Sequence, residues 1–147
     1  MKKLLVKLIC SFVIGKDRRK RVRYMLINRG RIRNSCDIPN IKRYLRNGLI
    51  MRHPVGIVIS KNVEIGRNCT VYQNVTIGTK HGGSKVERLY PVIGNNVRIY
   101  AGSVVVGDVS IGDSSVVGAN SVVTKDIPAG EIWAGIPARF IGKNESW

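Results

Sequence analysis

The sequence predicts an all-β protein, a parallel β-helix of hexapeptide repeats with a short basic segment in front of it. Three observations lead to this prediction. Ile and Val recur at every sixth position from Ile65 onward, turn-forming residues crowd the positions between them, and positive charge is concentrated before residue 53. The 147 residues are 44% hydrophobic, which is enough for one domain with a packed core.

The N-terminal part of the chain is strongly basic. Residues 1–52 hold 16 Lys and Arg against two acids, a net of +14, and residues 53–147 hold nine against seven, a net of +2, which together give +16. Lys7 interrupts the first apolar stretch and no small-residue cleavage site follows it, so we predict a basic amphipathic helix over residues 1–35 and not a signal peptide. Two roles stay open, namely packing on a neighbouring subunit or attachment to an anionic membrane surface.

Several classes of protein are disfavoured by composition. No apolar run approaches the roughly 20 residues of a membrane-spanning helix. Cys10, Cys36 and Cys69 are widely spaced and form no CxxC pair, which favours a reducing, cytoplasmic setting without a metal site. Aromatic residues make up only 6% of the chain, so we expect no nucleic-acid partner despite the charge.

A period of six is neither helical nor a simple strand alternation. The first position of each repeat is always Ile or Val: Ile65, Val71, Ile77, Ile93, Ile99, Val105, Ile111, Val117 and Val123. The fifth position is small or apolar: Cys69, Val75, Val97, Ser103, Val109, Ser115, Ser121 and Ile127. Three hexapeptides make one coil of 18 residues, and we expect the first residue of each repeat to point inward.

The repeat is interrupted once and becomes ambiguous at its beginning. Ile77 and Ile93 are 16 residues apart, one repeat of six plus ten extra residues, so we predict a loop over 79–91 that is ejected from the helix and carries His81. Continued backward, the register gives Ile59, His53, Asn47 and Ile41. The pattern alone leaves His53 either in the core or turned outward into a cleft.

Several motifs in this order and spacing resemble one known family. They are DIP (37–39), HPVGIVI (53–59), YQNVTIG (72–78), GANSVVTKDIP (118–128) and AGIPARFIGK (134–143). Over about residues 36–143, leaving a tail at 144–147, the chain resembles the left-handed β-helix acyltransferases, in the serine acetyltransferase-like branch that includes short enzymes acting on bacterial surface polysaccharides. The resemblance implies a left-handed helix, a homotrimer and acetyl-CoA bound between subunits.

The resemblance also assigns the chemistry. It implies that His53 is the general base on an acceptor hydroxyl and that Asp37 orients it. Histidine titrates near neutrality, and a carboxylate on its far nitrogen fixes the tautomer and stabilises the imidazolium. For acetyl-CoA, the resemblance implies small wall positions at Ala101 and Ala119. It implies a nucleotide end formed by Thr124, Lys125 and Arg139.

The chain departs from serine acetyltransferases where those enzymes hold serine. Arg52 stands where they carry an acid, and Leu89 and Tyr90 stand where they carry an arginine and a histidine. We expect Arg52, His81 and Tyr90 to line the acceptor site. The expected acceptor is therefore a hydroxyl of a sugar in a surface polysaccharide or its lipid-linked precursor, at the inner face of the membrane. The alternative is a serine O-acetyltransferase of cysteine biosynthesis.

Three other classes compete less well. A zinc carbonic anhydrase on the same fold needs three histidine ligands per metal, and this chain has two histidines. A structural or ice-binding β-helix would show regular threonine ladders, which the sequence lacks. A purely basic binding module has no support beyond charge.

Overall fold

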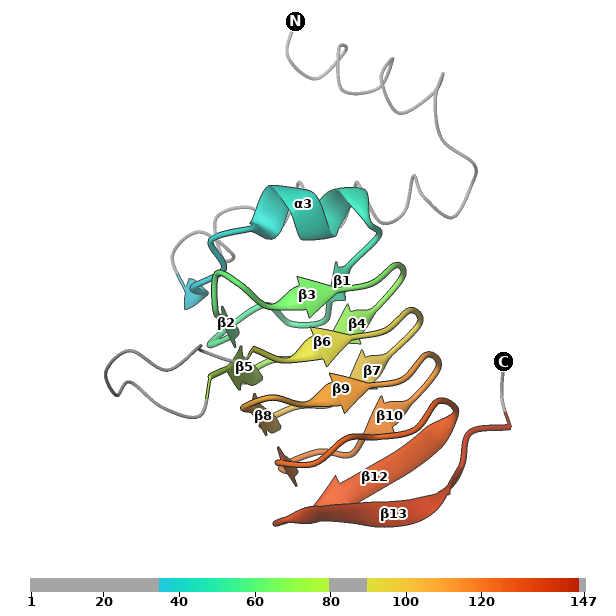
Figure 1. The fold of residues 1–147 in the computed structure, drawn as a ribbon. Coiled ribbons are helices and arrows are strands. Elements are labelled where there is room, and N and C mark those ends of the chain that lie inside the picture. Colours follow the sequence, from blue (N-terminus) through green and yellow to red (C-terminus); the bar gives the residue numbers. More distant parts are fainter. Residues whose placement is uncertain (1–34, 80–89, 146–147) are drawn as a thin grey trace, which may run out of the picture.

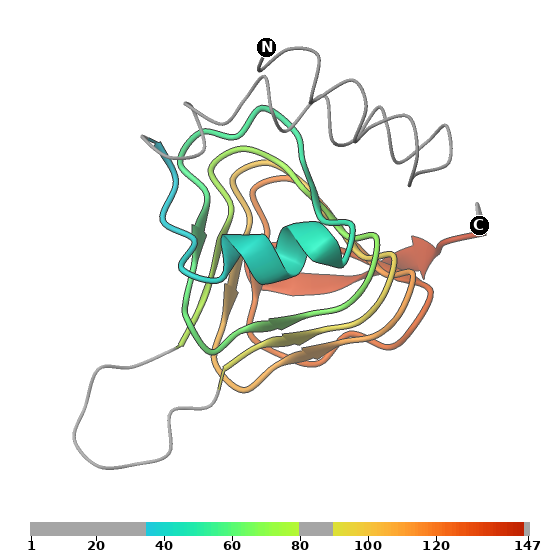
Figure 2. The same ribbon diagram turned by 90° about the horizontal axis from the view of Figure 1, so that it is seen from above.

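The computed structural model describes residues 35–79 and 90–145 and shows a three-sided parallel β-helix (Figures 1 and 2). The predicted N-terminal helix lies outside the described residues, apart from Ser35, and so do His81 and most of the predicted loop. That loop nevertheless has the predicted limits, because the strand before it ends at Gly78 and the next begins at Val92. No helix in the described part is both long and apolar enough to cross a membrane.

Each side of the prism is one sheet of very short strands. Face 1 contains β1 (Ile50–Met51), β4 (Thr70–Val71), β7 (Arg98–Ile99) and β10 (Val116–Val117), followed by β12 (Glu131–Gly135) and β13 (Ala138–Lys143). Face 2 contains β2 (Val58–Ile59), β5 (Thr76–Gly78), β8 (Val104–Val106) and β11 (Val122–Val123). Face 3 contains β3 (Glu64–Ile65), β6 (Val92–Ile93) and β9 (Ser110–Ile111). Neighbouring strands are parallel, except for the antiparallel hairpin of β12 and β13.

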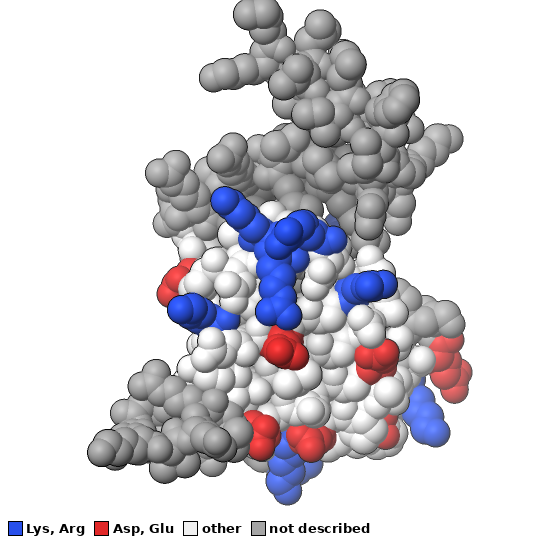
Figure 3. Space-filling model, turned by 45° about the horizontal axis from the view of Figure 1, so that its top comes forward, with Lys and Arg blue, Asp and Glu red and all other residues white. Residues whose placement is uncertain are grey.

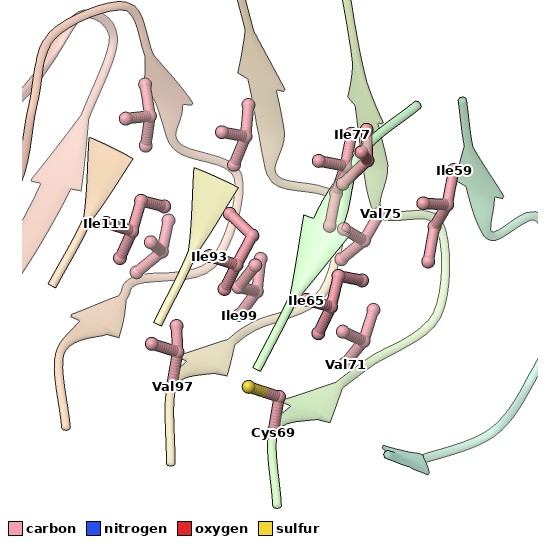
Figure 4. Packing of buried hydrophobic residues seen from close by; sticks show 14 of the residues in the cluster. Ile59, Ile65, Cys69, Val71, Val75, Ile77, Ile93, Val97, Ile99 and Ile111 are labelled. Atoms are coloured by element: carbon pink, nitrogen blue, oxygen red, sulfur yellow. The ribbon is translucent and has the colours of Figure 1, made fainter. Parts of the chain in front are cut away.

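The predicted core is confirmed. All nine first-position residues are at most 5% exposed, and the fifth-position residues are at most 2% exposed. They stack in columns from coil to coil (Figure 4). Burying an Ile or Val side chain contributes roughly 1.5–3 kcal/mol, so the columns stabilise the helix although the strands β1 to β11 are only two or three residues long.

The register predicted before Ile59 is wrong at Ile41 and Asn47. These residues belong to α3 (Ile41–Arg46) and its C-cap, which close the end of the prism. Tyr44 of α3 is buried, and its hydroxyl donates to the Val63 carbonyl oxygen at 2.7 Å. Burial is the main cause that raises the pKa of Tyr44. A helix of six residues is too short to produce a periodic signal that competes with the hexapeptide repeat.

The corner between β1 and β2 contains two more residues than the equivalent corner of the next coil. Met51 pairs with Val71 and Ile59 pairs with Ile77. The interval from 51 to 59 is eight residues, whereas the interval from 71 to 77 is six. Met51, at 2% exposed, therefore occupies the inward position that the periodicity gave to His53. The two extra residues expand the corner between β1 and β2.

The C-terminal end of the prism carries the β12–β13 hairpin, which continues face 1 beyond the last coil (Figure 1). The hairpin places large apolar side chains in solvent: Ile136 is 75% exposed, Ile141 64% and Phe140 50%. This surface differs from the rest of the prism, where apolar side chains mainly point inward.

Candidate active site

His53 lies at one edge of the prism, where face 1 turns into face 2. We call this the His53 edge, formed in successive coils by residues 52–56, 72–74, 100–102 and 118–120. Backbone hydrogen bonds align the corners: Asn74 N donates to Val55 O at 2.9 Å, Gly102 N to Gln73 O at 3.0 Å, and Asn120 N to Ala101 O at 2.8 Å. Residues distant in sequence are thereby brought into one row.

The expanded corner turns His53 outward. Its φ is 50°, in the left-handed region, and its side chain is exposed. Val55 N donates to the His53 carbonyl oxygen at 2.8 Å, which makes a tight turn. Gly56 follows with φ 64°, and a Cβ there would lie 2.4 Å from Asn74 Oδ1. The turn and the glycine hold an accessible imidazole at the edge, so His53 is not a core histidine.

Asp37 precedes α3 and lies next to β2, at the capped end of face 2. It forms a parallel bridge with Val58, in which Asp37 N donates to Ile57 O at 2.9 Å and Ile59 N donates to Asp37 O at 2.9 Å. Its side chain is exposed. The segment that carries Asp37 thus pairs with the strand that directly follows the His53 corner.

A stacked pair of tyrosines runs down the His53 edge below Arg52. Arg52 N donates to Val71 O and Tyr72 N donates to Ile99 O, so Arg52, Tyr72 and Tyr100 occupy equivalent positions in successive coils. The rings of Tyr72 and Tyr100 have centroids 4.9 Å apart and planes 24° apart. Arg52 is exposed, and both tyrosines are half-buried. We did not predict this pair from the sequence, although both tyrosines hold the second position of a repeat.

Gln73 adds an unusual group at the same edge. Its Oε1 is buried and has no hydrogen-bond partner. A buried acceptor without a donor costs about 1–3 kcal/mol of stability. Nothing in the hexapeptide pattern distinguishes Gln73 from an ordinary turn residue.

The lower part of the His53 edge is lined with small residues. Ala101 is half-buried and Ala119 is exposed. Gly118 N donates to Trp133 O at 2.8 Å, and a Cβ on Gly118 would lie 2.7 Å from the Cβ of Ala134. Ala134 pairs with Arg139 across the β12–β13 hairpin, so this exposed cation lies at the bottom of the edge.

Three predicted site residues lie elsewhere. Thr124 and Lys125 follow β11 and are exposed at the edge between faces 2 and 3, which we call the Lys125 edge. Tyr90 is half-buried against the core just before β6, where the ejected loop rejoins the prism near the same edge. Within one chain, face 2 separates these residues from Ala101 and Ala119.

Other reactive side chains are unsuited to this site. Burial raises the pKa of the Cys69 thiol to about 11, and Sγ donates to Gly94 O at 3.0 Å, so Cys69 is a packed structural residue. Residues 35–79 and 90–145 contain no group of three or more His, Cys, Asp or Glu arranged to hold a metal ion. Chemically, the edge offers an accessible imidazole, a row of small residues below it and a terminal cation.

The chain is similar in sequence to a transferase family model and to serine acetyltransferases. Residues 90–125 match the bacterial transferase hexapeptide (six repeats). A serine acetyltransferase of Helicobacter pylori is 40% identical over 97 residues, which are 66% of this chain and 56% of that protein. A serine acetyltransferase of Mycobacterium tuberculosis is 37% identical over 93 residues, 63% of this chain and 40% of that protein.

Solved structures of serine acetyltransferases are also similar to this chain. A serine acetyltransferase from Brucella abortus in complex with coenzyme A superimposes with a TM-score of 0.60 at 33% identity, over 65% of this chain and 37% of that one. Soybean serine acetyltransferase complexed with serine superimposes with a TM-score of 0.59 at 34% identity, over 63% of this chain and 37% of that one. The three-sided helix is therefore the left-handed kind. The chain spans between 37% and 56% of the length of these four proteins.

Proposed function

We propose, on the premise that this chain is a serine acetyltransferase-like hexapeptide-repeat protein, that it is an acetyl-CoA-dependent O-acetyltransferase. The observation that carries the proposal is the outward-turned His53 at the head of an edge lined with small residues. Similarity to a structure with bound coenzyme A supports acetyl-CoA as the cosubstrate.

In the proposed mechanism, His53 acts as the general base. The imidazole takes the proton of the acceptor hydroxyl while the hydroxyl oxygen forms a bond to the thioester carbonyl carbon. The carbon–sulfur bond then breaks, and the imidazolium returns the proton to the departing thiolate. The products are an acetyl ester and free coenzyme A. We assign Asp37 the role of orienting His53 and stabilising the imidazolium, because its segment pairs with the strand after the His53 corner.

We assign the cosubstrate to the lower part of the His53 edge. Ala101 and Ala119 leave room for an extended chain to run close to the backbone, and Arg139 supplies a cation for phosphate groups. Thr124 and Lys125 are proposed for the nucleotide end, yet they belong to another edge. We propose that a molecule meeting both sets is shared between two copies of the chain, within the homotrimer that the resemblance implies.

Serine is the acceptor that the comparisons favour, because the relatives are named serine acetyltransferases and one structure is described with serine. This alternative has better support than the expected polysaccharide. A sugar hydroxyl remains the second candidate for one reason: exposed Arg52 beside His53 supplies no acid for the ammonium group of serine. We keep Arg52, Tyr90 and His81 as proposed acceptor contacts, His81 lying outside the described residues.

The test is release of free thiol from acetyl-CoA by the full chain. L-serine is compared with L-alanine, which has the same charges and lacks the hydroxyl, and with UDP-N-acetylglucosamine. Release that depends on serine and not on alanine would establish the serine reaction. Release that depends only on the sugar nucleotide would establish the second candidate. No acceptor-dependent release with any hydroxyl compound would contradict the proposed acetyltransferase.

A further inference from the structure

The charge of the described prism is polarised along its axis. Residues 35–67, which form the capped end, hold six Lys and Arg against two acids, a net of +4. Residues 90–113 hold one Arg against two acids, a net of −1, and residues 114–145 hold three against three. Residues 68–79 are uncharged. The excess positive charge of the prism therefore lies at one end.

Helix α3 presents much of this charge. Its Tyr44 is buried, and Ile41 and Leu45 pack against the core, so these three residues fix the helix on the prism. Lys42, Arg43 and Arg46 are exposed. We call these three cations the cap face. Figure 3 shows Lys and Arg side chains gathered at this end of the molecule, and Figure 2 shows α3 lying across it.

The helix dipole of α3 explains only some of the cations on the cap face. Arg43 and Arg46 are in the last turn of α3, where a cation interacts favourably with the helix dipole. Lys42 has no such role, and Lys61 and Arg67 add two more exposed cations from the first coil. The far end of the prism has the same number of cations as acids. A general need for solubility would not distinguish the two ends in this way.

We propose that the cap face docks on an anionic lipid bilayer. A helix laid across the end of the prism offers cations that meet a flat layer of headgroups together, each Lys or Arg contributing to attraction near the surface. The chain just before the described part supports a membrane over other anions. Residues 1–34 hold 12 Lys and Arg against one acid, and LLVKLICSFVI places apolar residues among them, a composition typical of interfacial segments.

Docking there has a consequence for the proposed reaction. His53 and Arg52 belong to the first coil, which lies next to α3, so the catalytic corner would lie close to the bilayer surface (Figure 1). An acceptor carried by a lipid, or held at the headgroup layer, would then reach the base directly. This consequence rests on the proposed function, whereas the docking itself does not.

The test is co-sedimentation of the full chain with vesicles. One set contains equal parts of phosphatidylglycerol and phosphatidylcholine, and the other contains phosphatidylcholine alone. The cap variant is Lys42→Gln, Arg43→Gln and Arg46→Gln, which keeps Tyr44, Ile41 and Leu45. The matched control, Lys125→Gln, Arg139→Gln and Lys143→Gln, removes three cations from the far end. Circular dichroism and thermal melting verify that both variants are folded.

We expect the wild type to bind the anionic vesicles only, with binding that weakens as salt rises. The cap variant should lower the partition coefficient by about 100-fold, and the control by less than about threefold. Equal losses in both variants, or none in the cap variant, would overturn the proposal. The proposal would also be overturned if the wild type bound duplex DNA more tightly than vesicles and the cap variant lost this DNA binding. Vesicle binding without acetyltransferase activity would leave the docking surface standing and contradict only the proposed function.

Discussion

Two edges of the prism flank face 1. Both contain left-handed turn residues, but their side chains differ. At the His53 edge the left-handed residues include His53, Gly56, Asn74, Gly102 and Asn120, and at the opposite edge they include Asn68, Asn96, Ser114 and Gly130. We call the second one the Asp113 edge. Its polar groups are connected: Asn95 Oδ1 accepts from Arg67 N at 2.8 Å, and Asp113 Oδ1 accepts from Asn95 N at 2.7 Å.

The His53 edge carries a different set of groups. It carries an outward imidazole, an exposed guanidinium, a stacked pair of tyrosines and the buried, unpartnered Oε1 of Gln73. Stability alone would favour polar groups that satisfy one another, as at the Asp113 edge. The comparison teaches that side chains at the Asp113 edge connect one coil to the next, while the His53 edge exposes an imidazole and a guanidinium to solvent.

The largest expected effect is on activity at the His53 edge. His53→Asn removes the base but keeps a residue that tolerates the φ of 50°. We expect turnover in thiol release from acetyl-CoA to fall by about 10²–10⁴-fold, with the melting temperature nearly unchanged. Asn96→Gly, at a left-handed position of the Asp113 edge, is the control. Wild-type turnover in His53→Asn would remove His53 from the chemistry.

A smaller but clear effect is expected on stability at the Asp113 edge. A Cβ on Gly112 would lie 2.4 Å from Ala129 N and 2.7 Å from Ala129 Cα, so backbone atoms must move. Gly112→Ala should lower the free energy of unfolding by about 1–3 kcal/mol in urea titrations. Gly142→Ala, where no atom lies within 4 Å of the added methyl group, is the control. Equal stability of these two variants would show that the coils at this edge are not tightly packed.

The tyrosine stack tests whether the His53 edge contributes any stability of its own. A double-mutant cycle with Tyr72→Ala and Tyr100→Ala measures the coupling free energy of the two rings. An offset stacked pair typically contributes about 0.5–1.5 kcal/mol beyond its buried area, and we expect a value in that range. Strictly additive effects of the two substitutions on unfolding would mean that the stack is a surface feature without energetic consequence.

The smallest expected effect is the pH dependence of the stability that Asp113 contributes. Its carboxylate accepts hydrogen bonds from Asn95, first from the backbone N–H and then from the side chain, and these lower the pKa of Asp113. A lowered pKa means that the contribution to stability is present above the unfolded value of about 3.9 and is lost as the pH falls through the folded value. Asp113→Asn should therefore be less stable than wild type at pH 7 and equal to it in stronger acid.

Urea titrations at both pH values measure this difference, with Asp108→Asn as a control that removes one charge from an exposed turn. A stability loss in Asp113→Asn that persists unchanged in acid would mean that the carboxylate charge plays no part in the ladder.

The prism was predictable because its signal is repeated many times. Nine inward residues share one spacing, so a single exception cannot hide the period. The same logic left His53 open between the core and the surface, because the two residues added to its corner occur only once. The segment from Pro54 to Gly56 gives a hint of them, since proline and glycine mark a turn where the other coils have Gln73 and Asn74.

The edges themselves were harder to predict. Tyr72 and Tyr100 are 28 residues apart, one coil of 18 plus the ten extra residues of the ejected loop, so the loop conceals their alignment. The resemblance placed Ala101, Ala119, Thr124 and Lys125 in one ligand site. The structure puts the alanines and the other pair on different edges of one chain, and the spacing of one chain cannot show whether two copies bring these edges together.

The division between the two edges is tested most directly by measuring His53→Asn and Gly112→Ala together. The rate of acceptor-dependent thiol release per folded molecule and the free energy of unfolding are determined for both variants and for the wild type. We predict opposite outcomes: His53→Asn is stable and nearly inactive, and Gly112→Ala is destabilised and active while folded. If His53→Asn retains wild-type turnover, or if Gly112→Ala loses turnover without losing stability, chemistry and stability are not divided between these edges.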